Sequence, residues 1–329
     1  MNKRSDLVAD PVARALILVP GSVNYFYNLC GRRLADSLAN LGIEAHVTTL
    51  DDCPPGEYEW CALSNISEIV VSYGDERGGL AALKSLRRRC RSMVSCSMDC
   101  VQTPWYKRVC ELGFAVDADL FLDLGLADQS AWIDSAVESK YRFLFSGLTP
   151  RESRRVDNLD DGSHDRHIPW AFVGHMTESR VALVDFLVHQ FDPGGFVYIP
   201  TLAPYTEIDS PHLNEQQFER VLCHTRYQMW RSHHEHFYLE PERFRTSLLT
   251  GGVPIKIVEP DLEIPADAPF GYLMISLEEL RSWAATTRFS TTLQRFRSDW
   301  RRQPTLTQGI REVLIEARIA APTRDSLAA

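Results

Sequence analysis

Short continuous apolar runs alternate along this chain with longer segments whose apolar residues recur at helical spacing. The first run, residues 15–19, has no polar interruption, which is typical of a strand buried on both faces of a parallel sheet. Pro20 and Gly21 then turn the chain, and four leucines between positions 29 and 41 line one face of a predicted helix. A second strand is expected over 44–50, so the chain opens as a β-α-β unit.

The alternation continues to residue 147 and resumes after a polar segment. In the first part we expect strands over 68–73, 91–97, 118–125 and 141–147, with helices over 78–90, 104–112 and 128–137. Thr149 to Arg166 has hardly an apolar residue, which indicates a linker or surface loop. Beyond it we expect strands over 168–173, 196–200, 226–230, 253–259 and 271–276, separated and followed by helices.

The predicted fold class is therefore α/β, with two doubly wound, Rossmann-like domains that face each other across a cleft. The predicted division is a first domain of residues 1–150, a linker of residues 151–167, and a second domain of residues 168–329 that includes the terminal helices.

Composition narrows the class of protein and of partner. A length of 329 residues fits two domains of about 150 residues each. The net charge of −9 and the sequence pI near 5.6 argue against a nucleic-acid partner, because such proteins usually carry a basic surface. The stretch from Ala15 to Gly31 is broken by Pro20 and several polar residues, so we expect no transmembrane segment and a cytoplasmic protein.

The first candidate site follows the strand expected over 168–173. Gly174 lets a ligand approach the backbone, and Thr177 stands at the start of a helix whose free N–H groups carry partial positive charge. Arg180 in that helix adds a full positive charge. This combination predicts a diphosphate site; the alternative is an ordinary strand-to-helix turn.

The second candidate site is the segment from Arg226 to Glu259, in which a strand leads into an aromatic, acidic loop, a short helix and another strand. Such a loop lies at the carboxyl edge of the sheet, where open parallel sheets bind ligands. Arg243 at the loop-to-helix junction suits bidentate binding of phosphate, and a nearby carboxylate suits sugar hydroxyls. The alternative is a surface helix with an exposed arginine. The residues predicted to bind the ligand in this segment are Tyr238, Glu240, Arg243, Gly251 and Gly252.

These two segments resemble the donor-sugar half of GT-B glycosyltransferases, and most of all the CgeB-like and exostosin-like members. Gly174, Thr177 and Arg180 fit the family pattern at the start of the donor domain. Gly252-Val253-Pro254-Ile255 fits the family's G-x-P-V/I sequence after the later helix. The resemblance covers residues 168–300.

One position departs from the family pattern R-x-x-E-x-L-x-x-G. Arg243, Leu248 and Gly251 match it, but Thr246 stands where the family often has glutamate. Recognition of the ribose would then fall to another carboxylate, either Glu240 or Glu242.

The resemblance implies a glycosyltransferase that moves a sugar from a nucleotide-diphosphate sugar, its co-substrate, to an unknown acceptor, with no other cofactor. The acceptor could be a glycan, a lipid-linked glycan, a protein or a small molecule. Residues 1–150 would form the acceptor-side domain and residues 168–329 the donor domain. Two alternatives stay open: a nucleotide-sugar epimerase of the same fold, and a non-catalytic partner or scaffold protein.

Catalysis of sugar transfer often needs a base for the acceptor hydroxyl. Asp99, after the strand expected over 91–97, is the best carboxylate for this role, although a turn or N-cap function is the alternative. Asn24 and Tyr25, after the first strand, lie where such groups would also project.

The resemblance also implies that no metal is required, because GT-B enzymes stabilise the leaving group with side chains and a helix N-terminus. The D-x-D spacing that often holds a divalent ion occurs at Asp117 and Asp119, which could simply flank a buried strand. The run from His233 to His236 lacks the spacing of a helical zinc site.

Overall fold

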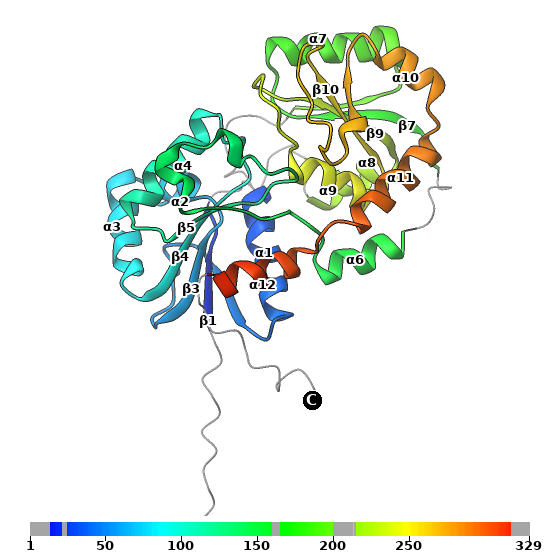
Figure 1. Cartoon of the computed structure of the whole chain (residues 1–329). Helices are drawn as coiled ribbons and strands as arrows, with labels where there is room; N and C mark the ends of the chain where they lie inside the picture. The colour runs from blue at the N-terminus through cyan, green and yellow to red at the C-terminus, as the bar shows by residue number, and fades with distance from the viewer. Residues whose placement is uncertain (1–13, 22–24, 160–164, 200–212, 214, 317–329) are drawn as a thin grey trace, which may run out of the picture.

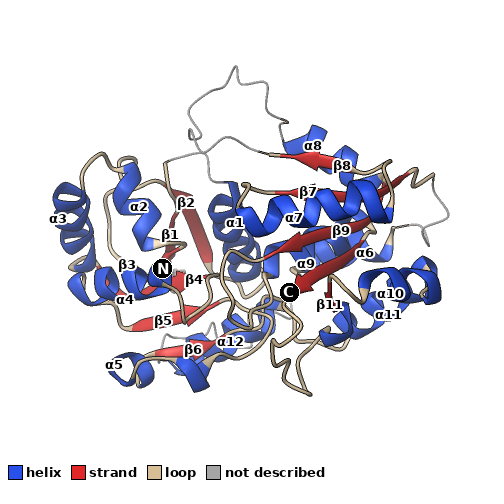
Figure 2. Cartoon of the chain, turned by 90° about the horizontal axis from the view of Figure 1, so that it is seen from above, coloured by secondary structure: helices blue, strands red, loops and turns tan. Residues whose placement is uncertain are grey.

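The structure is a computed structural model that describes residues 14–21, 25–159, 165–199, 213 and 215–316 (Figure 1). It contains two parallel sheets, one of six strands and one of five, each with helices packed against it. Seen from above, the two sheets lie side by side in separate domains (Figure 2). In the described residues, no helix has the length and apolar character needed to cross a membrane.

The first sheet has the strand order β2-β1-β3-β4-β5-β6, and every neighbouring pair is parallel. Its strands are β1 (Arg14–Leu18), β2 (Glu44–Thr48), β3 (Tyr58–Leu63), β4 (Cys90–Ser97), β5 (Leu120–Asp123) and β6 (Tyr141–Phe143). The helices that belong to it are α1 (Tyr25–Ala39), α2 (Ile66–Ser72), α3 (Glu76–Arg87), α4 (Pro104–Ala115) and α5 (Ser135–Glu138), with a 3-10 turn at Ser130–Trp132.

The second sheet has the order β11-β10-β9-β7-β8, again all parallel. Its strands are β7 (Ile168–Val173), β8 (Phe196–Tyr198), β9 (Thr225–Arg231), β10 (Val253–Val258) and β11 (Met274–Ser276). The later helices are α7 (Glu178–Phe186), α8 (Glu215–Cys223), α9 (Pro241–Thr250), α10 (Leu280–Thr286), α11 (Phe289–Arg301) and α12 (Leu306–Glu316). A π-helical turn at Leu187–Phe191 extends α7, and a 3-10 turn at Gly271–Leu273 precedes β11.

The expectation of a strand over 68–73 is wrong, because this segment lies in helix α2. Asn65 caps that helix by accepting a hydrogen bond from the backbone N–H of Glu68 at 3.1 Å. Ile66 and Ile69 are buried, whereas Val71 is 70% exposed, which is a helical rather than a strand pattern. The strand of this part of the sheet is β3, which the sequence interpretation missed.

The polar segment between the domains is partly helical. Helix α6 (Pro150–Asp157) begins with a capping box, in which Thr149 accepts from the N–H of Glu152 and Glu152 accepts from the N–H of Thr149. Pro150 occupies the first helical turn, where its missing N–H is not needed. Local capping therefore makes a helix where composition alone indicated a loop.

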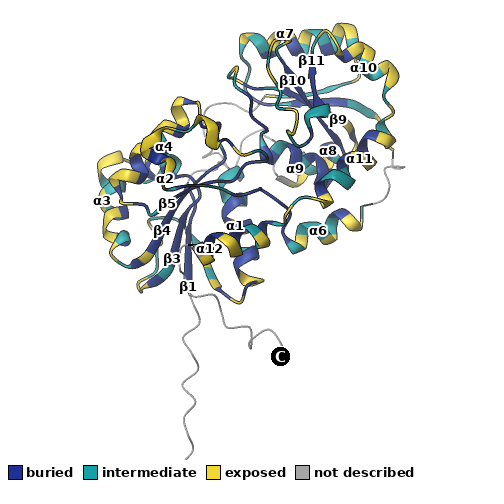
Figure 3. Ribbon diagram, in the orientation of Figure 1, coloured by how far each residue is buried: buried dark blue, intermediate teal, exposed yellow. Residues whose placement is uncertain are grey.

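The C-terminal helix α12 returns to the first domain. Figure 1 shows it beside α1, and its apolar residues belong to the hydrophobic cluster that α1 forms with β1, β3 and β4. The α12 residues in that cluster are Leu306, Ile310, Val313 and Leu314. The inner strands β3, β4 and β10 are almost wholly buried, the edge strands β2 and β8 are half-buried or exposed, and the helices expose their outer faces (Figure 3).

The carboxyl ends of both sheets meet at the junction between the domains. Tyr238, after β9, donates a hydrogen bond from its hydroxyl to the carbonyl of Met98, after β4. The rings of Trp105 and His233 lie 5.9 Å apart across the same junction. Since ligands of open parallel sheets bind at this edge, a ligand site is expected at the junction.

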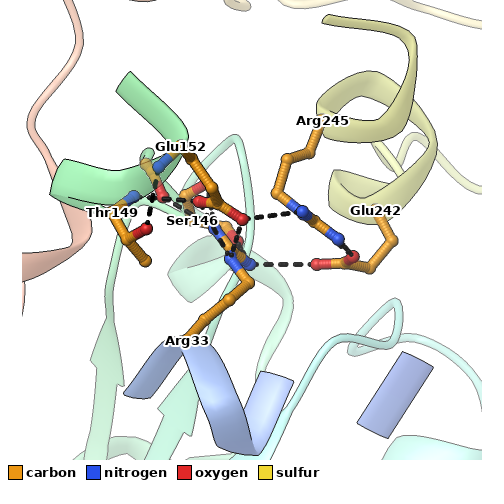
Figure 4. A network of polar contacts seen from close by, with 7 residues as sticks. Arg33, Ser146, Thr149, Glu152, Glu242 and Arg245 are labelled. Carbon is orange, nitrogen blue, oxygen red and sulfur yellow. Dashed lines mark hydrogen bonds and ion pairs between the residues drawn. The ribbon is translucent and has the colours of Figure 1, made fainter. Parts of the chain in front are cut away.

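A buried ionic cluster joins the domains near this junction (Figure 4). Arg33 of α1 donates to Glu242 of α9 at 2.9 Å and lies 3.2 Å from Glu152 of α6. Arg245 of α9 donates to Glu152 at 2.7 Å and also pairs with Glu242. None of these four side chains is more than 12% exposed. Two guanidinium groups thus neutralise two carboxylates that are nearly inaccessible to water.

The balance of charge keeps the cluster ionised. Burial raises the pKa of Glu152, but the guanidinium groups of Arg33 and Arg245 outweigh it and hold that pKa below its ordinary value. The stabilisation from this carboxylate is therefore present at neutral pH, and it is lost as the pH falls through the ordinary glutamate pKa and below it.

Replacing one residue of the ionic cluster should lower the stability of the fold, because its partners become uncompensated buried charges. We expect Arg245→Met to lower the free energy of unfolding by about 3–5 kcal/mol, measured by urea denaturation at pH 7. The matched control is Arg301→Met, since Arg301 pairs with Asp157 at 2.8 Å on an exposed surface. The free energy of unfolding of Arg301→Met should fall by no more than about 1 kcal/mol. Equal losses for the two variants would contradict the importance of the cluster.

Candidate functional site

Two guanidinium groups flank Gly174 at the end of β7. A Cβ atom placed on this glycine would lie 3.3 Å from Nη2 of Arg243 and 3.4 Å from Nη1 of Arg180. Gly174 has a φ of 153°, a backbone conformation that side chains disfavour. Glycine is therefore needed here both for the backbone and for the close approach of the two arginines, which come from α7 and α9.

Backbone carbonyls hold the arginines in place. Arg180 donates from Nε to the carbonyl of Arg231 at 2.8 Å and from Nη1 to that of His175 at 2.9 Å. Arg243 donates to the carbonyl of Val173 at 2.8 Å and lies over the ring of Trp230. Burial, followed by the charge of Arg243, lowers the pKa of Arg180 to about 10. Two positive charges held this close together form an anion-binding environment.

The topology of the second sheet places Gly174, Arg180 and Arg243 at its topological switch point, where successive connections leave in opposite directions along the sheet. The chain leaves β7 for β8 on one side and then continues to β9 on the other side. The segment after β7 contains Gly174 and Thr177, and the segment after β9 leads to Glu240 and Arg243. A crevice outside the carboxyl ends of strands at such a point is the usual ligand position in this type of sheet.

The N-termini of α7 and α9 also lie at this edge. Thr177 and Glu240 are the N-cap residues, and neither uses its side chain to cap its helix. The hydroxyl of Thr177 instead contacts that of Ser179 at 3.2 Å. The peptide dipoles of the two helices add partial positive charge at these N-termini, on the side where the guanidinium groups lie.

Glu240 is a half-buried carboxylate with its own counter-charge. Nζ of Lys256, on β10, lies 3.0 Å from its Oε2, and the hydroxyl of Ser232 donates to its Oε1. Burial raises the pKa of Glu240, but Lys256, Ser232 and Arg243 lower it to about 2. Glu240 is therefore ionised at neutral pH and can accept hydrogen bonds from hydroxyl groups.

Lys256 was missed by the sequence interpretation. It is 1% exposed and donates to the carbonyl of Tyr238 as well as to Glu240. The available signal was a single lysine within the otherwise apolar strand Val253–Val258. Tyr238 itself is buried, and its hydroxyl is occupied by the bond to Met98, so it serves the contact between the domains.

On the other side of the junction, Asp99 follows β4. Its carboxylate lies 3.5 Å from both the amide nitrogen of Asn65, after β3, and the hydroxyl of Ser97. Burial, with a smaller contribution from the charge of Glu68, raises the pKa of Asp99 to about 6. A carboxylate with this pKa is ionised at neutral pH and is basic enough to take a proton.

Asp123, at the end of β5, supports the loop that carries Asp99 and was also missed. Its carboxylate accepts hydrogen bonds from Tyr141 at 2.8 Å and from Gln129 at 3.2 Å. Gln129 in turn accepts from the N–H of Val101 at 3.1 Å. Burial raises the pKa of Asp123 to about 7. The sequence signal was an aspartate directly after an apolar run, a position that also fits a simple strand end.

Gly251 and Gly252, two residues predicted to bind the donor, do not lie beside Arg180 and Arg243. They lie at the C-terminal end of α9, one helix length from Arg243, and their N–H groups donate to Leu248 and Ser247. Gly251 has a φ of 69°, the left-handed conformation of a helix C-cap. Of the residues predicted for the acceptor side, Asn24 lies outside the described residues and Tyr25 is the first residue of α1.

The aspartates of the D-x-D spacing lie elsewhere. Asp119 directly precedes β5, so it is at the amino edge of the first sheet. Its two oxygens are occupied by Nη2 of Arg87 at 2.9 Å and by the N–H of Met93 at 2.7 Å. Asp117 sits in a left-handed turn before it. Across the described part of the chain, no group of three or more His, Cys, Asp or Glu residues is arranged to hold a metal ion.

No protein-family model and no curated protein matches this sequence. Solved structures of similar shape do exist. An alpha-glucosyltransferase in complex with UDP and a 13-mer DNA containing a HMU base has a TM-score of 0.61 at 9% identity, over 93% of this chain and 100% of that chain. The same type of enzyme with UDP and a 13-mer DNA containing a central A:G mismatch has a TM-score of 0.60 at 11% identity, over 93% and 99%.

A third similar structure is T4 phage BGT in complex with UDP and Mn2+, with a TM-score of 0.52 at 11% identity, over 93% of this chain and 99% of that chain. The two parallel-sheet domains of this chain thus have the fold of GT-B glycosyltransferases, which confirms the predicted fold class.

The prediction that excluded a nucleic-acid partner is wrong. Two of the structures with this fold hold a DNA 13-mer. The prediction rested on the net charge and the pI of the whole chain, which sum over every surface, whereas phosphate binding depends on the local field of a few side chains. Arg180 and Arg243 lie together here although the chain carries a net charge of −9.

Proposed function

We propose that this protein is a glycosyltransferase that takes a sugar from a nucleotide-diphosphate sugar. The observation that carries the proposal is the pair of guanidinium groups, Arg180 and Arg243, placed against Gly174 at the switch point of the second sheet. The shared fold with UDP-bound glucosyltransferases supports it. In this role the donor diphosphate lies against the two arginines and the N-termini of α7 and α9.

The reaction needs one bond to break and one to form. The bond between the anomeric carbon and the diphosphate oxygen breaks, and the leaving diphosphate takes the electron pair while Arg180 and Arg243 stabilise its developing charge. The acceptor hydroxyl forms the new glycosidic bond and gives its proton to Asp99. Glu240, ionised and anchored by Lys256, accepts hydrogen bonds from hydroxyl groups of the donor.

The acceptor is the open part of the proposal. The DNA-bound structures make DNA an acceptor class to test directly, beside glycans, proteins and small molecules. We also propose that the protein is cytoplasmic and that it is related to the CgeB-like and exostosin-like glycosyltransferases. An epimerase of this fold, or a non-catalytic scaffold, is separated from a transferase by assaying donor hydrolysis and sugar transfer.

A thermal-shift screen of nucleoside diphosphates and their sugars tests the proposal first. A nucleotide at 100 times its dissociation constant should add about 2.7 kcal/mol of stability. If none of UDP, GDP, ADP, TDP or their sugars shifts the transition, the proposed donor site is wrong.

Arg243→Ala should weaken nucleotide binding by about 1.5–3 kcal/mol, the scale of a hydrogen bond to a charged group. The measurement is isothermal titration of the folded variant with the nucleotide found in the screen. Arg281→Ala is the matched control, because Arg281 is exposed on α10 and contacts Gln190. Equal affinity of the Arg243 variant and the wild type would remove Arg243 from the site.

The pH dependence of transfer should report Asp99. Because burial raises its pKa to about 6, kcat/KM should rise with pH through about 6 and level off above it. Asp99→Asn should remove this limb and lower the rate by about 10²–10⁴-fold, with nucleotide affinity unchanged. A variant that keeps both the limb and the rate would show that another group is the base.

Transfer should proceed without a bound metal, since Arg180 and Arg243 are placed to stabilise the leaving group and Asp119 is committed to Arg87. The test is sugar transfer, or donor hydrolysis, in excess EDTA. Activity that chelation abolishes and manganese restores would contradict this expectation and make Asp117 and Asp119 the next residues to mutate.

A further inference from the structure

Arg33 belongs to the first domain but contacts the helix that carries Arg243. Its guanidinium group donates to Glu242, to the hydroxyl of Ser146, and to the carbonyls of Ser146 and Gly147, the last at 2.7 Å. Its Nε lies 3.2 Å from Glu152. All its nitrogens therefore have partners, and only 6% of the side chain is exposed. Such a group is fixed in position by its surroundings.

The contact with Glu242 falls within the first turn of α9. That turn begins after the N-cap Glu240, and it includes Arg243, the residue that follows Glu242. Arg245 of the same helix is held in the same cluster through Glu152. Because a helix moves as a rigid unit over one turn, whatever fixes Glu242 also fixes the backbone of Arg243.

Glu152 ties the cluster to the connection between the domains. It pairs with Arg33 and Arg245 and also caps α6, the helix that follows the last strand of the first sheet. Helix α1 of the first domain, the connecting helix α6 and helix α9 of the second domain thus share one set of buried charges (Figure 4).

We propose that Arg33 is a positioning residue for the donor site: from the acceptor-side domain it sets where α9 presents Arg243 to the donor diphosphate. This inference rests on the proposed function. It means that donor affinity depends on a residue that does not touch the donor and lies in the other domain. The cluster then couples the arrangement of the domains to nucleotide binding.

A variant that keeps the charges of the cluster balanced can distinguish an effect of Arg33 on stability from an effect on the position of Arg243. Arg33→Met alone leaves two carboxylates facing one arginine, so a loss of binding could follow from poor folding. The double variant Arg33→Met with Glu242→Gln removes one charge of each sign and leaves the Arg245–Glu152 pair at 2.7 Å intact. Its stability should recover relative to the single variant, whereas the link between α1 and α9 stays broken.

The experiment measures two quantities on the full chain: the urea midpoint, and the dissociation constant for the nucleoside diphosphate that binds the wild type. For the double variant we expect recovered stability and a nucleotide affinity that remains about tenfold weaker than wild type, since small misplacements of a binding group have large effects. In steady-state transfer, the KM for the donor should rise with kcat changed less. Arg32→Met, at the exposed neighbouring position, is the control and should match the wild type.

Recovery of nucleotide affinity together with stability in the double variant would overturn the proposal, because Arg33 would then be only structural. If the double variant does not fold, Arg33→Lys replaces it, since lysine keeps the charge but not the planar fork that spans Glu242, Glu152 and the carbonyls. A folded Arg33→Lys protein with wild-type affinity would equally refute the positioning role. Failure of the wild type to bind any nucleotide would instead refute the proposed function.

Discussion

Charges that are buried between two domains must be neutralised where they lie, and Arg33, Glu152, Glu242 and Arg245 meet that requirement together. Their side chains are nearly inaccessible to water, so the loss of any one leaves a charge that solvent cannot screen. The cluster joins α1 of the first domain, the connecting helix α6 and α9 of the second domain. The contact of Tyr238 with Met98 and the neighbouring aromatic rings complete the junction around it.

The candidate site has a different electrostatic arrangement. Backbone carbonyl oxygens accept hydrogen bonds from Arg180 and Arg243 and orient their guanidinium groups. Glu240, the carboxylate proposed to bind hydroxyl groups of the donor, already has Lys256 as its counter-charge. The cluster at the junction pairs two arginines with two carboxylates and supports the fold, while Arg180 and Arg243 bring two guanidinium groups together beside Gly174, an arrangement that suits an anion. An acidic chain can in this way present a basic site.

The fold is shared with an alpha-glucosyltransferase and with T4 phage BGT at 9–11% identity, a level at which few individual residues correspond. What such chains hold in common is the pattern of buried strands and amphipathic helices, and with it the switch points of two parallel sheets. A ligand site then follows from the topology, whereas its chemistry depends on the side chains that each chain places there.

The sequence by itself determined the local features: the apolar runs of β1, β4 and β10, the leucine face of α1, and Gly174, Arg180, Glu240 and Arg243 as candidates beside predicted helix starts. These follow from residues close together in the chain. It failed at α2, where a cap at Asn65 decided the structure, and it missed Lys256 and Asp123. Only the tertiary structure brought Arg33 to Glu242, 209 residues away. Periodicity reports which face of an element is buried, but pairing between buried charges depends on how distant elements pack.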